Sequence, residues 1–202
     1  VRTSRSEHLE IAQKLAADMI ARGAKPDDSV AVLMRNDVLM FSLIEACQLV
    51  GVRYAPINWH AAPKEVTYIV EDSSSKILYG HADLLMPVMP ELTQDIDVIA
   101  FPVPPCIQHA YGVSDEMPDH VVPVPLILAQ STPYQGEAQK YRGIFAYTSG
   151  STGRPKGIRR AFNPEGTDSW QTYLGLARNL MHANAGDKFY VAAPLYHSAP
   201  NA

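Results

Sequence analysis

The residues best suited to chemistry lie in one loop, between positions 147 and 157. The loop has the sequence Tyr-Thr-Ser-Gly-Ser-Thr-Gly-Arg-Pro-Lys-Gly and follows a short apolar run, Ile144–Ala146. Its glycines let the backbone turn sharply and bring N–H groups close to a ligand, while its hydroxyls add further donors. Lys156 adds a compact positive charge, and no acid interrupts the series. We therefore predict a site for a polyanion, of which a nucleotide triphosphate is a common example.

Two familiar phosphate-binding loops are excluded by the spacing of these residues. A Walker A loop needs a glycine, four residues and then Gly-Lys-Ser/Thr, but Pro155 stands where the second glycine should follow Gly150. The dinucleotide fingerprint Gly-x-Gly-x-x-Gly does not fit the interval between Gly150 and Gly153. A flexible, solvated linker is the more frequent use of a Ser/Thr/Gly loop. The interpretation therefore depends on the particular string of residues.

Composition excludes several classes of protein. The chain has 202 residues, 47% of them apolar, with a formal net charge of −4, and is long enough for one domain or part of a larger one. Basic residues form no stripe, so nucleic acid is not an expected partner. Cys47 and Cys106 stand far apart, which argues against a disulfide framework or a Cys-x-x-Cys metal site. Cys47 is expected to be a core thiol.

No segment of the sequence indicates secretion or membrane insertion. The longest apolar stretch, Val38–Val50, is too short to span a membrane and contains Ser42, Glu45 and Gln48. No signal peptide opens the chain. We therefore expect a cytoplasmic location, and the sequence leaves the oligomeric state open.

The elements that must position the loop alternate between helix and strand. Ser4 and Glu7 have capping-box spacing, and Asn36 or Asp37 can cap the next helix, Val38–Val50. Helices are predicted from Ser4 to Gly23, over Val38–Val50 and from Pro63 onward, and strands over Val30–Met34, Tyr54–Ile57, Lys76–Tyr79 and Asp97–Phe101. Helical crossovers between such strands predict an α/β fold with a doubly wound, mostly parallel sheet and flanking helices.

The second half of the chain has a less regular pattern. Pro87 and Pro90 shorten or bend any helix over Ala82–Leu92. The proline-dense segment Pro102–Pro133 is expected to be a long irregular excursion over the surface. The strand Ile144–Tyr147 is expected to find its neighbours among the earlier strands. Further elements are predicted as a strand over Ile158–Phe162, a helix over Glu165–Asn184 and a strand over Phe189–Ala193.

The string Tyr147–Gly157 resembles the phosphate-binding signature of the adenylate-forming (AMP-binding) enzymes, which include acyl-CoA synthetases and peptide-synthetase adenylation domains. Only Arg154 stands at a free position. The stretch Pro194–Ser198 resembles the Pro-Leu-aromatic-His stretch of the acyl-CoA synthetase branch. Much of the first half, including Pro56–Asn58, is also similar to the usual N-terminal pattern of this family, with less specific matches.

The resemblance implies roles for individual residues. The β- and γ-phosphates of ATP would be held by Thr148, Ser149, Gly150, Ser151, Thr152, Gly153, Lys156 and Gly157. Thr152 would help to place Mg²⁺, and Lys156 would balance the charge of the leaving pyrophosphate. His197 would lie beside the acyl carboxylate, so Lys156 and His197 are the candidate catalytic residues. Tyr147 is expected to pack at the end of its strand rather than contact the ligand.

The chain also departs from the family pattern. After Gly157 the family often continues with a valine and a Thr-His pair, whereas this chain has Ile158–Ala161. Residues 1–202 contain neither the Tyr-Gly-x-Thr-Glu stretch nor the Thr-Gly-Asp motif, nor the mobile C-terminal domain with its catalytic lysine. The resemblance therefore implies an incomplete N-terminal ATP/acyl-substrate domain that is inactive alone.

The function implied is that of an ATP-dependent carboxylate–CoA ligase, such as a fatty-acid or related acyl-CoA synthetase. Such an enzyme forms an acyl-adenylate and then an acyl-CoA thioester, with a carboxylic acid, ATP and coenzyme A as small-molecule partners. One alternative is an adenylation domain that loads an amino or aryl acid onto a carrier protein. Another is a non-catalytic nucleotide-binding or interaction module. The His197 stretch favours the CoA branch, and the sequence leaves the acyl substrate open.

Overall fold

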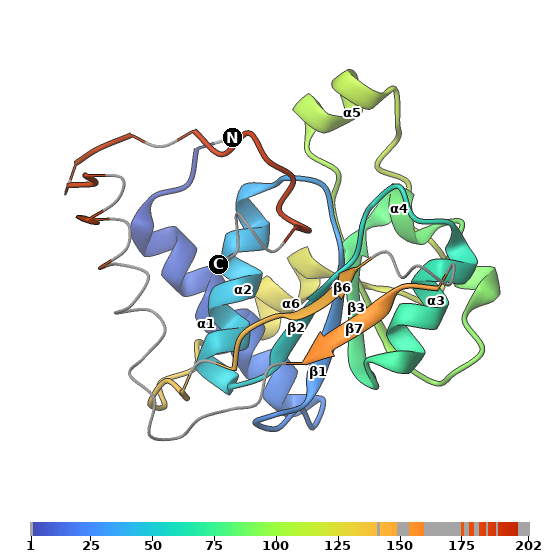
Figure 1. Ribbon diagram of the computed structural model, residues 1–202, viewed down its shortest axis with the longest axis horizontal. Helices are drawn as coiled ribbons and strands as arrows, with labels where there is room; N and C mark the ends of the chain where they lie inside the picture. Colours follow the sequence, from blue (N-terminus) through green and yellow to red (C-terminus); the bar gives the residue numbers. More distant parts are fainter. Residues whose placement is uncertain are drawn as a thin grey trace.

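A five-stranded parallel sheet forms the centre of the computed structural model, with strand order β2-β1-β3-β4-β5 (Figure 1). The structure describes residues 2–140, 142–148, 154–159, 175, 178–179, 182–184, 186–188 and 190–197. The strands of this sheet are β1 (Ser29–Leu33), β2 (Arg53–Pro56), β3 (Ser75–His81), β4 (Asp97–Phe101) and β5 (Val122–Pro123).

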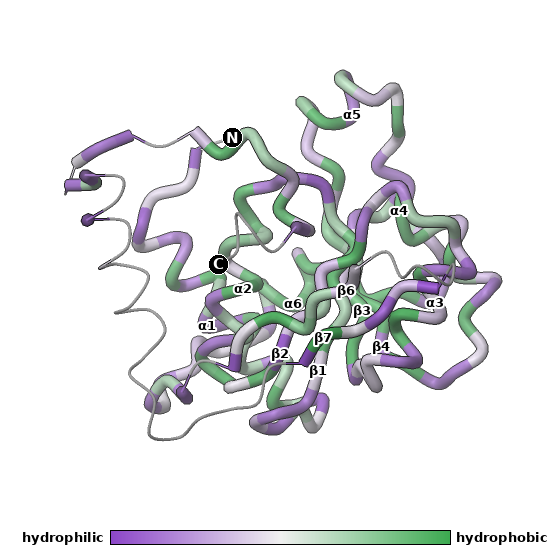
Figure 2. Tube along the Cα trace, in the orientation of Figure 1, coloured by the Kyte–Doolittle hydropathy of each residue, from purple (hydrophilic) through white to green (hydrophobic). Residues whose placement is uncertain are grey.

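Helices cover both faces of this sheet. Along β1, Val30 and Val32 point to one face, while Ala31 and Leu33 point to the other. The first face is covered by α1 (Arg5–Ala21), α2 (Val38–Val50) and α6 (Val124–Gln130), and the second by α3 (Pro63–Asp72) and α4 (Ala82–Leu85). Figure 2 shows the buried strands as hydrophobic and the turns around them as more hydrophilic. The predicted doubly wound α/β fold is therefore confirmed.

The helix ends follow the capping signals in the sequence. Ser4 and Glu7 form the predicted capping box, in which Ser4 N donates to Glu7 Oε2 over 2.7 Å. Asp37, rather than Asn36, caps α2, because its Oδ1 accepts from Leu39 N over 3.1 Å. Gly51 closes α2 with a left-handed φ of 77°. Asn36 is thereby left with its side chain free for another contact.

The segment Pro102–Pro133 is more regular than the sequence predicts. It contains α5 (Pro105–Tyr111), the edge strand β5 and α6, so the expectation of an irregular excursion is wrong. Four of its seven prolines, Pro104, Pro105, Pro123 and Pro125, lie at helix starts, where no intrahelical N–H bond is required, or in the strand at the edge of the sheet. Val124 and Ile127 of α6 are buried in the core. By contrast, the predicted shortening before Leu92 is confirmed by α4 and a 3-10 turn, η1 (Met89–Glu91).

The strand that precedes the candidate loop belongs to a separate hairpin. Strand β6 (Phe145–Thr148) pairs antiparallel with β7 (Lys156–Arg159) and is tied to the main sheet by one parallel bridge, between Ile144 and Tyr54. The predicted pairing with an earlier strand is therefore seen at one bridge to β2, while the partner along β6 is β7. β7 begins before the predicted Ile158, so Lys156 and Gly157 lie on a strand.

The last predicted elements fall mainly outside the described residues. Within Glu165–Asn184, only Gly175, Arg178 and Asn179 are described as helical. The described residues Tyr190–Ala193 adopt no strand, so the strand predicted there is wrong for these four positions. Within the described part of the chain, no helix is long and apolar enough to cross a membrane.

Candidate functional site

The β6–β7 hairpin brings the two ends of the candidate phosphate loop together. Thr148, the last residue of β6, lies opposite Lys156, the first residue of β7, and both are exposed. The predicted binding residues Ser149, Gly150, Ser151, Thr152 and Gly153 lie outside the described residues. The structure thus places a hydroxyl and an ammonium group side by side at the base of the loop, where both can reach a ligand.

Both ends of the loop also contact α3. Tyr147 donates its hydroxyl hydrogen to Asp72 Oδ2 over 2.7 Å, and Tyr68 reaches Asp72 Oδ1 over 3.4 Å. Burial and the adjacent Asp72 carboxylate raise the pKa of Tyr147 well above its usual range, so its hydroxyl remains a donor. In the second half of the loop, the Arg154 guanidinium lies 5.7 Å from the centre of the Tyr68 ring. Tyr147 therefore positions the loop, consistent with the expectation that it packs rather than binds ligand.

Gly157 has a packing reason to be glycine. Phe145 and Tyr147 stack on one face of the hairpin with ring centres 5.2 Å apart. A Cβ atom on Gly157 would lie 2.6 Å from Phe145 Cε2 and 3.0 Å from Tyr147 Cζ. Any side chain at this position would therefore displace the aromatic pair that supports the loop. A role for Gly157 in phosphate binding remains a prediction.

The predicted catalytic residue His197 lies on a separate turn. His197 N donates to Pro194 O over 3.1 Å, and its exposed ring lies 4.4 Å from that of Tyr196. Leu195 anchors the turn because its side chain is buried in the main core. The Asn36 side chain holds the same segment, with Nδ2 donating to Ala193 O over 3.0 Å and Oδ1 accepting from Leu195 N over 2.7 Å.

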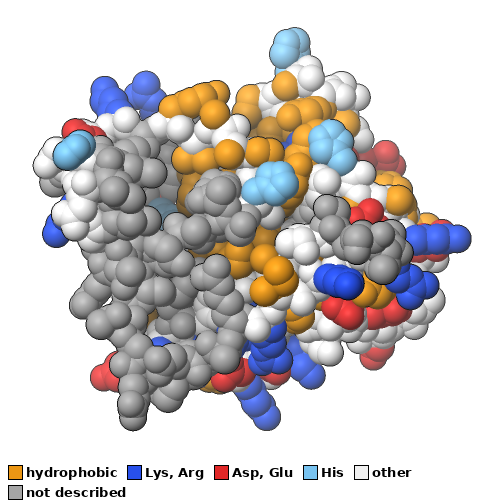
Figure 3. All heavy atoms as spheres, in the orientation of Figure 1, with side chains coloured by type: hydrophobic (Ala, Val, Ile, Leu, Met, Phe, Trp, Pro, Cys, Tyr) orange, Lys and Arg blue, Asp and Glu red, His pale blue; other side chains and the backbone are white. Residues whose placement is uncertain are grey.

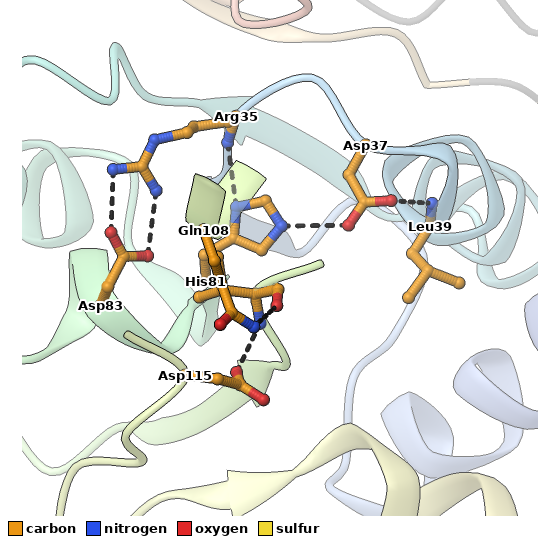
Figure 4. Close-up of polar contacts among 8 residues, drawn as sticks. Arg35, Asp37, Leu39, His81, Asp83, Gln108 and Asp115 are labelled. Atoms are coloured by element: carbon orange, nitrogen blue, oxygen red, sulfur yellow. Dashed lines mark hydrogen bonds and ion pairs between the residues drawn. The ribbon is translucent and has the colours of Figure 1, made fainter. Parts of the chain in front are cut away.

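The strand order places a topological switch point next to Asn36, between β1 and β3. Strand β2 lies on one side of β1, and strand β3 lies on the other. The connection after β1 therefore runs over one face of the sheet, and the connection after β3 runs over the opposite face. In open α/β sheets such a switch point at the carboxyl ends of the strands is the usual place for a ligand. In this chain it holds four polar side chains, shown in Figure 4: Arg35, Asp37, His81 and Asp83.

His81 is fully buried at this switch point and uses both ring nitrogens. Arg35 N donates to His81 Nδ1 over 3.2 Å, which requires that nitrogen to be unprotonated. Nε2 then carries the hydrogen and donates to Asp37 Oδ2 over 3.1 Å. The hydrogen-bond pattern therefore assigns a single neutral tautomer to His81.

Arg35 closes the other side of the same cluster. Its Nη1 and Nη2 reach Asp83 Oδ1 and Oδ2 over 2.9 and 2.8 Å. This bidentate ion pair fixes the orientation of the guanidinium. The guanidinium also lies 5.1 Å from the Trp59 ring centre and 4.8 Å from that of Tyr111. The side chains of Arg35, Asp37, His81 and Asp83 thus contact one another at the switch point, and these contacts hold the bend from Arg35 to Asp37 at both ends.

Sequence reasoning missed this cluster, although a signal was present. Each of its residues lies within four positions of the end of a buried strand: Arg35 and Asp37 follow β1, and His81 and Asp83 lie at or after the end of β3. Because carboxyl ends of parallel strands meet at one edge of a sheet, polar residues at these positions are expected to meet. The sequence suggested Asn36 as a possible helix cap and as part of the stretch that resembles the N-terminal pattern of the adenylate-forming enzymes, but not as a contact to a distant segment.

The described residues contain no group of three His, Cys, Asp or Glu side chains arranged to hold a metal ion. Thr152, the residue predicted to help place Mg²⁺, lies outside them. Cys47 is the core thiol that was expected, and its burial raises its pKa well above the usual range. Among the predicted site residues that the structure describes, Thr148, Lys156 and His197 offer an exposed hydroxyl, an ammonium and an imidazole group for ligand contact.

Comparison with known proteins identifies relatives of this chain. The chain is 25% identical over 189 residues to indoleacetate–CoA ligase of Aromatoleum aromaticum and 24% identical over 197 residues to 2-succinylbenzoate–CoA ligase of Bacillus subtilis, covering 93% and 95% of this chain. It spans 34% of each relative. A benzoate CoA ligase from Burkholderia xenovorans has the same fold, with a TM-score of 0.74, 16% identity, and coverage of 96% of this chain and 35% of that chain. The family model described as AMP-binding enzyme matches residues 1–200, so the chain belongs to the AMP-binding enzyme family.

Proposed function

We propose that this chain is the ATP- and acyl-binding part of an ATP-dependent carboxylate–CoA ligase. Membership of the AMP-binding enzyme family supports this, as do the two curated relatives, both of which are CoA ligases. The observation that carries the proposal is the pairing of Thr148 with Lys156 across the base of the loop, with both side chains exposed. The chain spans about a third of those relatives, so the complete reaction is proposed for the whole protein.

The loop would stabilise the leaving group of the first step. When a carboxylate attacks the α-phosphorus of ATP, pyrophosphate leaves and its negative charge grows. Lys156 supplies a positive charge from β7, and Thr148 supplies a hydroxyl donor from β6. Residues 149–153 would add the backbone and hydroxyl donors that the sequence predicts. Thr152 would help to hold Mg²⁺, which neutralises phosphate charge when bound.

The turn at His197 would serve the acyl substrate. Its ring is exposed beside Tyr196, on a segment anchored by Leu195. On the face drawn in Figure 3, hydrophobic side chains gather across the middle of the described surface, with histidines among them and most charged side chains toward the rim. An apolar area with a few polar groups suits the carbon skeleton and carboxylate of an organic acid. The activated acyl group would then pass to the thiol of coenzyme A.

Substitution of Lys156 tests the proposal. In the complete enzyme, Lys156→Ala is expected to lower carboxylate-dependent exchange of pyrophosphate into ATP by about 100-fold, the loss typical for one preorganised donor to a developing charge. Lys64→Ala, which removes an exposed lysine from α3, is the matched control and should leave exchange unchanged. Equal exchange in both variants would contradict the assigned role of the loop.

The acceptor of the acyl group separates this proposal from the carrier-protein alternative. Release of a free CoA thioester supports the ligase, whereas transfer only to the phosphopantetheine arm of a carrier protein supports an adenylation domain. The 202-residue chain alone is expected to bind ATP weakly and to form no adenylate. Measurable pyrophosphate exchange by the chain alone would overturn that expectation. Absence of exchange in the complete protein would favour a non-catalytic nucleotide-binding module.

A further inference from the structure

Asn36 binds a distant part of the chain in the way that a neighbouring strand would. Its Nδ2 donates to Ala193 O over 3.0 Å and its Oδ1 accepts from Leu195 N over 2.7 Å. The two bonds bracket Pro194, which has no N–H of its own. One primary amide therefore satisfies the backbone on both sides of the proline, 157 and 159 positions away in the sequence.

The backbone that carries Asn36 is held on both sides. Arg35 is fixed through its N–H to His81 Nδ1 and through its guanidinium to Asp83. Asp37 is fixed by His81 Nε2 and by its cap of α2. Figure 4 shows these contacts of Arg35 and Asp37. Both residues are buried, while Asn36 between them is exposed. Asn36 therefore lies exposed on a bend in which the residues on either side of it, Arg35 and Asp37, are held at the edge of the sheet.

The segment held by Asn36 leads directly to His197. Leu195 is buried at 2% exposure, and His197 N closes the turn onto Pro194 O over 3.1 Å. Because the turn begins at Pro194, any movement of the backbone between Ala193 and Leu195 also moves the imidazole. Asn36 bonds backbone atoms of this segment, Ala193 O and Leu195 N, so we expect it to act on His197 through the backbone.

We infer that Asn36 is a positioning residue for His197, and that the cluster at the switch point exists to hold Asn36 in place. This inference rests on the proposed function, in which His197 lies beside the acyl carboxylate. Asparagine suits the position because it offers one donor and one acceptor on a short side chain. Aspartate would retain the acceptor for Leu195 N but would place a carboxylate oxygen against Ala193 O, and alanine would retain neither bond.

Amide hydrogen exchange in the 202-residue chain tests the positioning directly. In Asn36→Ala, the amides of Leu195 and His197 are expected to exchange about tenfold faster, as two partly exposed hydrogen bonds are lost. Asn36→Asp should speed exchange less at Leu195 than Asn36→Ala does. Asn58→Ala is the matched control, because Asn58 is an exposed asparagine whose side chain accepts only from nearby His60 N, over 3.0 Å. Unchanged exchange at Leu195 in Asn36→Ala would overturn the inference whatever the protein's activity.

A double-mutant cycle in the complete enzyme tests the link to chemistry. Asn36→Ala is expected to lower kcat with a smaller effect on the KM for ATP, and to have no further effect in a His197→Ala background. Additive losses in the double variant would show that Asn36 does not act through His197. If His197→Ala leaves activity unchanged while Asn36→Ala still speeds exchange at Leu195, the proposed role of His197 fails and the positioning contact stands.

Discussion

The carboxyl edge of the five-stranded sheet and the β6–β7 hairpin hold their polar residues in opposite ways. At the sheet edge, Arg35 and His81 are buried, and their polar contacts come from within the cluster. On the hairpin, all four residues of β7 are exposed, and Thr148 and Lys156 face solvent at the base of the loop. The sheet edge is thus built to hold a backbone still, whereas the hairpin is built to present groups to a ligand.

This difference predicts two levels of local stability within one chain. Elements with many buried contacts open only when the whole fold does, whereas exposed elements with few tertiary contacts can open locally. β4 is buried between β3 and β5, while β6 has β7 and one bridge to Tyr54. Binding groups on the hairpin can therefore adjust without disturbing the sheet that carries Asn36.

A matched pair of phenylalanine substitutions gives the largest effects and tests this comparison. Phe101→Ala in β4, at 0% exposure, should lower the free energy of unfolding by about 4 kcal/mol, because the rigid core retains a cavity. Phe145→Ala in β6, at 9% exposure, should cost about 1.5 kcal/mol, since the hairpin can close around the gap. Urea unfolding monitored by circular dichroism measures both. Equal losses would show that the hairpin unfolds as one unit with the sheet.

Breaking the pair between Arg35 and Asp83 is expected to have the next largest effect. Arg35→Met leaves the Asp83 carboxylate without its partner in a nearly buried place and should destabilise the fold by about 3 kcal/mol. The double variant Arg35→Met/Asp83→Leu should recover much of this loss, because no uncompensated charge remains. Urea unfolding of the two single variants and the double variant gives the coupling energy. A double variant as unstable as Arg35→Met would show that the aromatic contacts of Arg35, rather than its charge, are what stabilise the edge.

The sheet could be predicted from sequence because its signals are local. The buried strand Asp97–Phe101 was predicted with both ends correct, and the helix Val38–Val50 with its cap and its closing glycine. The prolines between Pro102 and Pro133 misled the prediction, since proline density alone does not distinguish helix starts and sheet edges from an irregular segment. Helix α6 was missed for this reason.

The candidate site could be predicted only in part, because half of it depends on contacts between distant residues. The loop was predicted from a contiguous run of glycine, serine, threonine and lysine residues. The structure adds that Thr148 and Lys156 lie opposite each other on β6 and β7. The pairing of His81 with Asp37 joins residues 44 positions apart, and no local pattern encodes it. Likewise, the role of Asn36 depends on a segment that follows the loop.

On the hairpin side of the comparison, Tyr147→Phe should have a moderate effect. It removes the hydrogen bond to Asp72, and the expected cost is about 1 kcal/mol of stability. Because Tyr147 immediately precedes the loop, the KM for ATP in the complete enzyme should also rise several-fold. Tyr68→Phe is the control on the same carboxylate, where the contact is longer at 3.4 Å and a smaller effect is expected. A KM that is unchanged in Tyr147→Phe would show that α3 does not position the loop.

The smallest expected effect on stability is that of Glu7, a fully exposed residue at the start of α1. Because α1 packs on the sheet, this effect gives a lower limit for what one contact contributes to stability in that part of the molecule. The Ser4 backbone N–H, and after it the Ser4 side chain, lower the pKa of Glu7 below its usual value of 4.5. A carboxylate whose pKa is lower in the folded state stabilises the fold above pH 4.5, and this contribution is lost as the pH falls through the folded pKa. Glu7→Gln keeps an acceptor for Ser4 N but removes the titration, so the stability difference from the parent chain should be present at pH 7 and vanish under acid conditions. Urea unfolding across this range measures it, with Glu116→Gln, at an exposed glutamate outside α1, as the control for loss of one negative charge. A difference that persists at low pH would mean that the side-chain shape of residue 7, and not its charge, holds the helix end.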